Sequence, residues 1–469
     1  MLAKEGYEAQ ALLDRFDRIP YSRWHIKARV ILGTATFFDA FDALTIAFVL
    51  PVLIESWQLH PGQIGLLISS VFIGQFFGAL LFGWLAEKIG RIPSAILAIA
   101  IISTMSLVCA FATNYASLVT ARVVQGIGLG GEMPVAAAYI TEISGRKGRG
   151  RFFLLYELVF PLGLLLVGVV SAMVVPTIGW RAMFLLGAAP AVLIAFVIKS
   201  LPESPRWLIS KGRLAQAESV ISTVEASARR TDVTLDTNTV MHFPQYTSPR
   251  PASGNTASTI SLFSLVSGLW STSYRQRSVI LWILWITAYV VNLSLVTWLP
   301  SLYKTILHLS TRDSLLAGLV PNVFQVVAIL ACALLVDRVG RSTWFLGAFL
   351  ASAGLLLILS IFSHQLLAST YATILLASLT YAFTGTNCIL LYLYTTEVYP
   401  TRLRAFGVGV ATCWMRAGAA ISPLLIGALL GRFGITAVFG LFAGLCIAGA
   451  AATFWAPETG NEKLEDLSA

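Results

Sequence analysis

The sequence predicts an all-α membrane protein with twelve transmembrane helices in two pseudo-symmetric six-helix bundles. Composition, the length of the apolar runs and an internal repeat lead to this fold class. Of the 469 residues, 57% are hydrophobic and only 12% are charged, and the mean hydropathy is +0.78. Soluble domains carry about 25% charged residues, so the composition excludes an ordinary soluble protein.

The apolar residues fall into runs near the ~20 residues that an α-helix needs to cross a bilayer. Six runs lie in the first part of the chain, at 28–54, 62–86, 92–112, 117–142, 152–175 and 181–200. Six more lie at 278–303, 314–336, 342–363, 370–396, 404–430 and 435–455. The chain therefore divides into an N-terminal segment (1–27), a first bundle (28–200), a linker (201–277), a second bundle (278–455) and a C-terminal tail (456–469).

The linker is polar and rich in Ser, Thr, Arg and Pro. We expect helix at 211–230 and mobility around 231–260, because the latter stretch has few apolar residues to bury.

Most of the 32 Lys and Arg residues lie in the two termini, the linker and every second loop. Such residues accumulate on the cytoplasmic side of short loops, so both termini are predicted to be cytoplasmic in a multi-pass protein of the cell inner membrane. The net charge of +9 then reflects topology, and no nucleic-acid partner is needed to explain it. The first 27 residues are polar and the first apolar run is full length, so no cleavable signal is expected.

All five cysteines lie in apolar spans without the spacing of metal ligands. We expect them to be free thiols that pack as small apolar residues. Neither a metal site nor a cofactor is predicted. The cysteines are Cys109, Cys332, Cys388, Cys413 and Cys446.

The two halves of the chain repeat each other at three loops. Segment 83–91 (Gly-Trp-Leu-Ala-Glu-Lys-Ile-Gly-Arg) corresponds to 333–341 (Ala-Leu-Leu-Val-Asp-Arg-Val-Gly-Arg). Glu142 is followed by Lys147 and Arg149, and Glu397 is followed at the same spacing by Arg402 and Arg404. Pro202-Glu203 corresponds to Pro457-Glu458. Two parallel six-helix repeats place a solute path between them, with the binding site near the midplane.

At these loops the chain resembles the major facilitator superfamily. Segment 83–91 is similar to the family's G-x-L-x-D-x-x-G-R loop, with Glu87 where Asp is usual, and segments 201–208 and 397–404 resemble the sugar-porter and organic-ion-transporter motifs after helices 6 and 10. The resemblance implies that charged loops hold the cytoplasmic side closed in the outward-facing state. The alternative is that they only fix topology and cap helices. The implied gating residues are Gly83, Glu87, Arg91, Glu142, Arg149, Glu203, Arg206, Asp337, Arg341, Glu397 and Arg404.

Three stretches resemble niacin-type permeases and related metabolite and aromatic-acid:proton symporters. They are 37–42 (Phe-Phe-Asp-Ala-Phe-Asp), 126–135 (Gly-Ile-Gly-Leu-Gly-Gly-Glu-Met-Pro-Val) and 415–423 (Met-Arg-Ala-Gly-Ala-Ala-Ile-Ser-Pro). The third also resembles helix 11 of organic-anion transporters, where the arginine helps to hold the anion. A sugar fits less well, because the seventh span lacks the Gln-Gln-x-Ser-Gly-x-Asn pattern of sugar porters.

Ionisable residues inside a membrane cost ~2.5 to 3.5 kcal/mol each and usually mark substrate or proton paths. Asp39 and Asp42 lie three apart on the first span and share a face, so they are the predicted proton-coupling pair, together with Glu132 and Arg122 on the fourth span. Two alternatives stay open: a permanent Asp42–Arg122 ion pair, and a neutral packing role for Glu132. Glu157, on the fifth span, is assigned to gating or packing.

Arg416 is the only basic residue predicted near the midplane. Polar and aromatic side chains at similar depth complete a candidate substrate pocket, although aromatic residues at helical spacing more often belong to a core. A cation beside flat rings suits a small aromatic or short-chain carboxylate. The predicted pocket residues are Trp285, Tyr289, Asn292, Gln325, Tyr381 and Asn387.

The sequence thus predicts a monomeric proton-coupled symporter that imports a small organic anion, with nicotinate or a related carboxylate as the first candidate. No nucleophile, metal cluster or lipid-facing His-Asp constellation that a membrane enzyme would need is found. A proton-coupled sugar or organic-cation transporter and a non-transporting nutrient sensor are the alternatives. Uniport or antiport also stays open.

Overall fold

The computed structural model describes residues 2–145, 147–229, 262–305, 317–362, 369–460, 462 and 464. The described chain is almost entirely helical. Its first part contains α1 (Leu2–Asp17), α2 (Arg23–Trp57), α3 (Pro61–Ile89), α4 (Arg91–Ala110), α5 (Tyr115–Ile143), α6 (Arg149–Glu157), α7 (Val159–Thr177) and α8 (Arg181–Ile198). Three shorter helices follow: α9 (Pro205–Ser210), α10 (Leu214–Arg229) and α11 (Leu262–Leu269). The last part contains α12 (Arg275–Thr305), α14 (Val320–Val339), α15 (Arg341–Ile361), α17 (Thr370–Val398) and α18 (Thr401–Thr453).

Nine segments of the described residues are long and apolar enough to cross a membrane. Helices α5 and α8 and the portion of α18 before Gly434 run beside them and account for the rest of the twelve predicted spans. Most of the exposed large hydrophobic side chains lie on these spans, as expected for a surface that lies in lipid.

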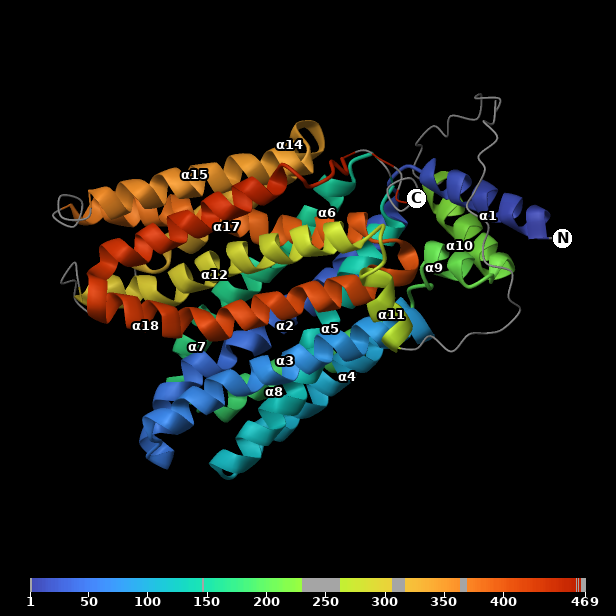
Figure 1. Ribbon diagram of the computed structural model, residues 1–469. Coiled ribbons are helices and arrows are strands. Elements are labelled where there is room, and N and C mark those ends of the chain that lie inside the picture. The colour runs from blue at the N-terminus through green and yellow to red at the C-terminus, as the bar shows by residue number, and fades with distance from the viewer. Residues whose placement is uncertain are drawn as a thin grey trace.

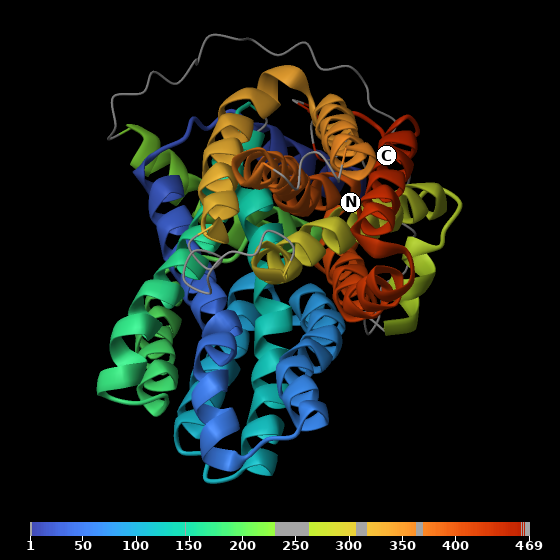
Figure 2. The ribbon, with the colours of Figure 1, turned by 90° about the vertical axis from the view of Figure 1, so that its left-hand side faces the viewer.

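The spans form two groups, α2 to α8 and α12 to α18, here called the N-terminal half and the C-terminal half. Figure 1 shows the two halves together at the end of the bundle that carries α1, α9 and α10, which we call the termini end, and diverging toward the opposite end. Figure 2, seen from that opposite end, shows the N-terminal half below the C-terminal half. This is the two-bundle architecture that the repeat predicts.

One predicted span differs from the helices in the structure. The predicted span 152–175 begins earlier, at Arg149, and is interrupted at Leu158 between α6 and α7. Pro161 explains the interruption, because it has no backbone N–H to bond the carbonyl of Glu157. The predicted spans 404–430 and 435–455 correspond to two helices that share the label α18 and are separated at Gly434, whose backbone is not helical and whose φ of 72° suits glycine.

The segments outside the bundles contain more helix than predicted. The helix expected at 211–230 is α10, whereas α1, α9 and α11 were not predicted, and the mobility expected at 231–260 lies outside the described residues. Helix α1 packs on α10, where Nε of Arg15 donates to Glu225 at 2.6 Å. This charged hydrogen bond raises the pKa of Arg15. The N-terminal segment is therefore attached to the linker.

Glycines bring α3 and α5 of the N-terminal half into backbone contact. A Cβ on Gly126 would lie 2.2 Å from the carbonyl oxygen of Val71, and one on Gly130 would lie 2.2 Å from that of Gln75. The glycine-rich stretch of α5 is thus a close-contact surface, as is usual between membrane helices. The prediction of five free, buried cysteines is also confirmed.

Candidate functional site

Asp42 is fully buried in α2, where its neighbours come from α4, α5 and α8. Its Oδ2 accepts a hydrogen bond of 2.9 Å from Oγ of Ser106, and Gln125 in turn donates to that hydroxyl. Arg122 donates to the side chain of Gln125 at 2.6 Å and to the backbone carbonyl of Asp42 at 3.2 Å. The Asp42–Arg122 ion pair considered above is absent from this part of the structure. Ser106 and Gln125 connect the two charged groups instead.

Asp39 lies one turn before Asp42 but has different neighbours. Its carboxyl is within electrostatic range of Glu132 in α5 and of Arg416 in α18. Oδ1 of Asp39 and Oε2 of Glu132 have no hydrogen-bond partner among the described residues. The other oxygen of Glu132 accepts a hydrogen bond from Thr36 at 3.1 Å. A hydrogen-bonded packing role, the alternative considered for Glu132, therefore explains only one of its two carboxyl oxygens.

Thr36 connects Glu132 with Tyr156. The hydroxyls of Thr36 and Tyr156 are 2.6 Å apart, and all three side chains are buried. A chain of groups that can carry protons therefore crosses the core of the N-terminal half, from α5 through α2 to α6.

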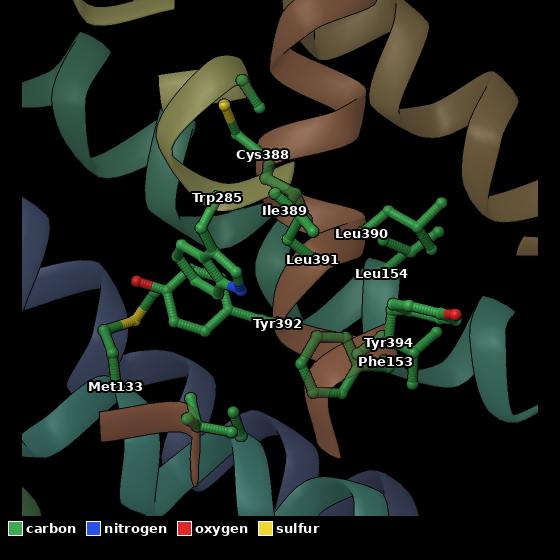
Figure 3. Close-up of a cluster of buried hydrophobic side chains, with 14 of the residues drawn as sticks. Met133, Phe153, Leu154, Trp285, Cys388, Ile389, Leu390, Leu391, Tyr392 and Tyr394 are labelled. Carbon is green, nitrogen blue, oxygen red and sulfur yellow. The ribbon is translucent and has the colours of Figure 1, made fainter. Parts of the chain in front are cut away.

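The C-terminal half contributes a cluster of aromatic rings. Trp285 and Tyr289, one turn apart on α12, stack with ring centroids 5.2 Å apart and an interplanar angle of 5°. Tyr392 of α17 meets Trp285 edge to face at 4.8 Å, and the indole N–H of Trp285 donates to Thr395 at 2.9 Å. Figure 3 shows Trp285 and Tyr392 lying against each other, with Met133 reaching toward them from α5. These rings meet the N-terminal half directly.

Arg416 lies in α18 beside this cluster and is 5% exposed. One of its terminal nitrogens donates to the carbonyl of Thr412 at 2.9 Å, whereas its Nε has no partner. Within the described ranges it forms no ion pair with a carboxylate, although Asp39 of the N-terminal half lies within electrostatic range. Its charge is therefore not neutralised by a fixed contact.

The other predicted pocket residues fall into two kinds. Asn292 donates to the carbonyl of Tyr381 at 3.2 Å and to the hydroxyl of Thr384 at 3.1 Å, so it connects α12 with α17. Gln325 packs on α17, since a Cβ on Gly385 would lie 2.3 Å from its Nε2. Asn387 is buried, and neither its amide nitrogen nor its oxygen has a partner in the described structure. Asn387 thus carries two fully buried polar atoms that have no hydrogen-bond partner among the described residues.

Charged pairs gather at the termini end of the N-terminal half. Arg91 forms ion pairs with Glu87 at 3.0 Å and with Glu142 at 2.8 Å, and all three side chains are fully buried. Arg404 of the C-terminal half also pairs with Glu142, at 3.1 Å. Glu87 of the N-terminal half accepts a hydrogen bond of 3.1 Å from the backbone N–H of Ala405 in the C-terminal half. The network thus joins the two halves.

The C-terminal half repeats this arrangement. Arg341 pairs with Asp337 at 3.0 Å and with Glu397 at 3.2 Å, and Arg149 of the N-terminal half pairs with Glu397 at 3.3 Å. Asp337 accepts from the backbone N–H of Gly150 at 2.9 Å. The two networks are related by the pseudo-symmetry that the loop motifs indicate.

Two further predicted gating residues, Glu203 and Arg206, also form contacts at the termini end. Glu203 accepts backbone hydrogen bonds at the start of α4, from Arg91 at 3.0 Å and Ile92 at 3.2 Å, and its counterpart Glu458 does the same at the start of α15. A carboxylate suits the positive end of a helix. Burial raises the pKa of Glu203 in spite of these contacts. Arg206 pairs with Asp17 and donates to the carbonyl of Glu142 at 3.1 Å.

Gly83 lies where the two halves touch. A Cβ there would lie 3.0 Å from the Cα of Phe406 and 3.1 Å from the carbonyl oxygen of Ala405. The glycine of the first loop motif therefore permits close contact between α3 and α18.

Sequence reasoning missed the uncharged partners of these groups. Ser106, Gln125, Thr36, Tyr156 and Tyr392 lie within apolar spans, and their spacing along the chain gives no signal of a site. They are recognised only when helices far apart in sequence are brought together.

The described residues also form a cavity of about 640 Å³ away from this cluster. It lies between α12 and the end of α18, on the surface that faces lipid, and Trp270, Arg275, Val279 and Trp455 are among its lining residues. None of the predicted site residues lines it, so its size does not argue for a substrate site.

Comparisons with known proteins agree with this architecture. The family model described as "Sugar (and other) transporter" matches residues 34–469. The niacin transporter NiaP of Acinetobacter baylyi is 31% identical, over 97% of this chain and 99% of its own. The inner membrane metabolite transport protein YgcS of Escherichia coli is 28% identical over 95% and 94%, and the 4-hydroxybenzoate transporter PcaK of Acinetobacter baylyi is 28% identical over 95% and 89%.

A solved structure of the major facilitator superfamily proton:xylose symporter XylE superposes with a TM-score of 0.77. It is 19% identical, and the match covers 95% of this chain and 99% of that one. At this identity the likeness concerns the fold. The family model and the relative that is 31% identical over nearly the full length show the family as well as the fold. The chain belongs to the sugar (and other) transporter family of the major facilitator superfamily, and is a multi-pass membrane transporter of small molecules, not an enzyme.

Proposed function

We propose that this protein is a proton-coupled importer of small aromatic or heteroaromatic carboxylates, with nicotinate as the first substrate to test. The observation that carries the proposal is Arg416, a buried guanidinium that lies beside stacked aromatic rings and has no carboxylate in ion-pair contact among the described residues. A buried charge without a partner is costly, so an anionic ligand is the natural partner. The niacin and 4-hydroxybenzoate transporters among the relatives are consistent with this class.

Substrate binding in this proposal joins the two halves. The carboxylate contacts Arg416, and the ring lies against Trp285 and Tyr289, with Asn387 supplying a free amide at similar depth. Asn292, Gln325 and Tyr381 hold the helices that carry these groups, because their contacts run between helices.

Proton coupling is assigned to the carboxyl groups of the N-terminal half. Asp42 shares a hydrogen-bond network with Arg122, and Asp39 lies within electrostatic range of Arg416. An anion bound at Arg416 changes the field at Asp39 and Glu132, which supplies a physical link between substrate binding and protonation. The proton:xylose symport named for XylE supports such coupling by analogy of fold.

The ion pairs at the termini end act as the gate. They join the halves there, while the helices diverge toward the other end. With both termini in the cytoplasm of the cell inner membrane, this arrangement is the outward-facing one. One chain supplies both halves of the path, so the protein functions as a monomer.

Uptake into proteoliposomes tests the proposal. An inside-alkaline pH gradient should drive accumulation of radiolabelled nicotinate, and dissipating the gradient with a protonophore should stop it. Accumulation of xylose or of an organic cation instead, with no uptake of aromatic acids, would contradict it.

A further inference from the structure

The cavity of about 640 Å³ beside α12 has no role in the proposed transport cycle. It lies between the start of α12 and the end of α18, where both helices reach the termini end. Most of its walls are apolar, with Val279 and Ile283 of α12 opposite Ala448 and Ala451 of α18. All four residues are exposed and belong to membrane-spanning segments. The cavity therefore opens toward the lipid and not toward the path between the two halves.

The polar residues of the cavity lie at one end of it. Arg275 and Gln276 form the start of α12 and are both exposed. Ile283 lies about 12 Å deeper, because eight residues of helix rise about 1.5 Å each. Since Arg275 is also the first residue of its membrane span, its guanidinium lies near the lipid head groups, while the apolar walls extend into the hydrocarbon.

Two tryptophans line the same end of the cavity. Trp270 follows α11 and is 49% exposed, and Trp455 follows α18 and is 64% exposed. Tryptophan is enriched at membrane–water interfaces, where its ring meets lipid and its N–H meets polar groups. Trp270 packs edge to face on Trp282 of α12, with ring centroids 5.4 Å apart. The aromatic residues thus place this end of the cavity at the membrane surface.

Helix α11 holds the position of Trp270. Its Leu265 and Leu269 are buried, whereas Phe263 and Val266 are exposed. Oγ of Ser278 donates to the carbonyl of Leu269 at 3.1 Å, so the end of α11 is attached to the start of α12. A short helix outside the spans that exposes large apolar side chains is suited to lie in the membrane interface.

The charge at the start of α12 is positive. Arg275 and Arg277 both lie in its first turn, which contains no acidic residue. The guanidinium of Arg277 lies over the ring of Tyr274, 5.7 Å from its centroid, and Arg275 forms no ion pair with a carboxylate in the part of the chain that the structure describes. The start of a helix is also the positive end of its dipole, so an anion bound beside Arg275 is stabilised by both.

We propose that this cavity binds one anionic phospholipid, with its phosphate at Arg275 and an acyl chain between α12 and α18. The lipid comes from the leaflet at the termini end, which is the cytoplasmic one in the topology proposed above. Charge complementarity favours an anionic head group such as phosphatidylglycerol over a zwitterionic one, because the guanidinium and the helix start both attract net negative charge. The site is separate from Arg416 and the aromatic cluster, so the inference does not depend on which solute is transported.

Native mass spectrometry of the purified protein tests this site. The protein in detergent is titrated with phosphatidylglycerol and with phosphatidylcholine of the same acyl chains. The wild type should bind one phosphatidylglycerol per chain, at least about tenfold more tightly than phosphatidylcholine. Arg275→Gln should lower the affinity for phosphatidylglycerol about tenfold and leave that for phosphatidylcholine unchanged. Ala448→Phe places a ring between the apolar walls and should weaken the binding of both lipids.

Arg338→Gln is the matched control for the loss of charge. Arg338 is exposed in the last turn of α14, at the same end of the molecule, and does not line the cavity. Its substitution should change the affinity for phosphatidylglycerol by less than about twofold. Equal losses in Arg275→Gln and Arg338→Gln would show a response to overall charge and would overturn the site. Unchanged binding in Ala448→Phe, no preference between the two lipids, or displacement of the lipid by inorganic phosphate would overturn it as well.

Discussion

Asp42 and Gly187 are in direct contact between α2 and α8. A Cβ on Gly187 would lie 2.2 Å from Oδ1 of Asp42 and 2.9 Å from its Cγ. The absence of a side chain at position 187 therefore creates the space that the carboxyl group occupies. The proposed proton site depends on a residue that carries no functional group.

Gly187→Ala should displace the carboxyl group of Asp42 and impair transport without removing any ionisable residue. Inserting a methyl group into a packed site costs about 1 to 3 kcal/mol, and Asp42 has to move away from Ser106. Active accumulation should fall at least about tenfold. Gly347→Ala is the matched control, because a Cβ at Gly347 meets nothing within 4 Å. Equal activity of the two variants in proteoliposomes would show that the position of Asp42 does not matter.

Asp42→Asn should abolish accumulation against a gradient while leaving part of the substrate exchange. The amide can still accept a hydrogen bond from Ser106, so the packing of α2 against α4 is preserved, but it cannot bind and release a proton. Uptake under a pH gradient and counterflow under equal pH are measured on the same vesicles. Asp39→Asn is tested in parallel, and accumulation that persists in both variants would refute the assignment of the coupling site.

Glu397→Gln should shift the resting population away from the state seen here. Glu397 pairs with Arg149 of the other half and with Arg341, so a single substitution weakens two buried pairs. Removing one partner of a buried ion pair costs about 3 to 5 kcal/mol. Nitroxides at Thr113 and Phe433, which are exposed on different halves, should report a shorter mean distance by pulsed electron resonance.

The control for this variant is Glu55→Gln, which neutralises an exposed acid away from the gate. It should leave the distance distribution unchanged. Lost transport with an unchanged distribution in Glu397→Gln would point to a folding defect and not to a shifted equilibrium.

The ion-pair networks at the termini end could be predicted from the sequence more completely than the surroundings of the candidate site residues. The charged residues of these networks lie at the ends of apolar runs and recur in both halves, so the repeat identifies Glu142 and Glu397 directly. The sequence also singles out Asp39 and Asp42, since carboxyl groups are rare in apolar segments. Their different surroundings could not be predicted, because a spacing of three residues leaves them on one helix face while their neighbours come from different helices.

The surroundings of Glu157 could not be predicted from the sequence. The sequence places it on the fifth span, but its electrostatic influence on Tyr289 and Tyr392 depends on how the two halves pack. That packing brings together residues more than a hundred positions apart, for which helical periodicity within one segment gives no information.

Arg416→Ala should weaken binding of the anionic substrate at least tenfold. The guanidinium has a hydrogen bond to the carbonyl of Thr412 but no carboxylate in ion-pair contact among the described residues, so its free donors are available to a ligand. Loss of a charged hydrogen bond costs about 1.5 to 3 kcal/mol, which corresponds to about a tenfold to hundredfold change in Kd.

Arg416→Lys separates charge from geometry at the same position. Lysine keeps the positive charge but cannot form the planar bidentate pair that a guanidinium forms with a carboxylate. Binding should therefore recover only in part, with Kd between those of the wild type and Arg416→Ala. Calorimetric titration with nicotinate, compared with nicotinamide as a neutral analogue, provides the measurement. If Arg416→Ala binds nicotinate as tightly as the wild type, or if nicotinamide is preferred and unaffected by the substitution, Arg416 has a structural role and the substrate is not an anion.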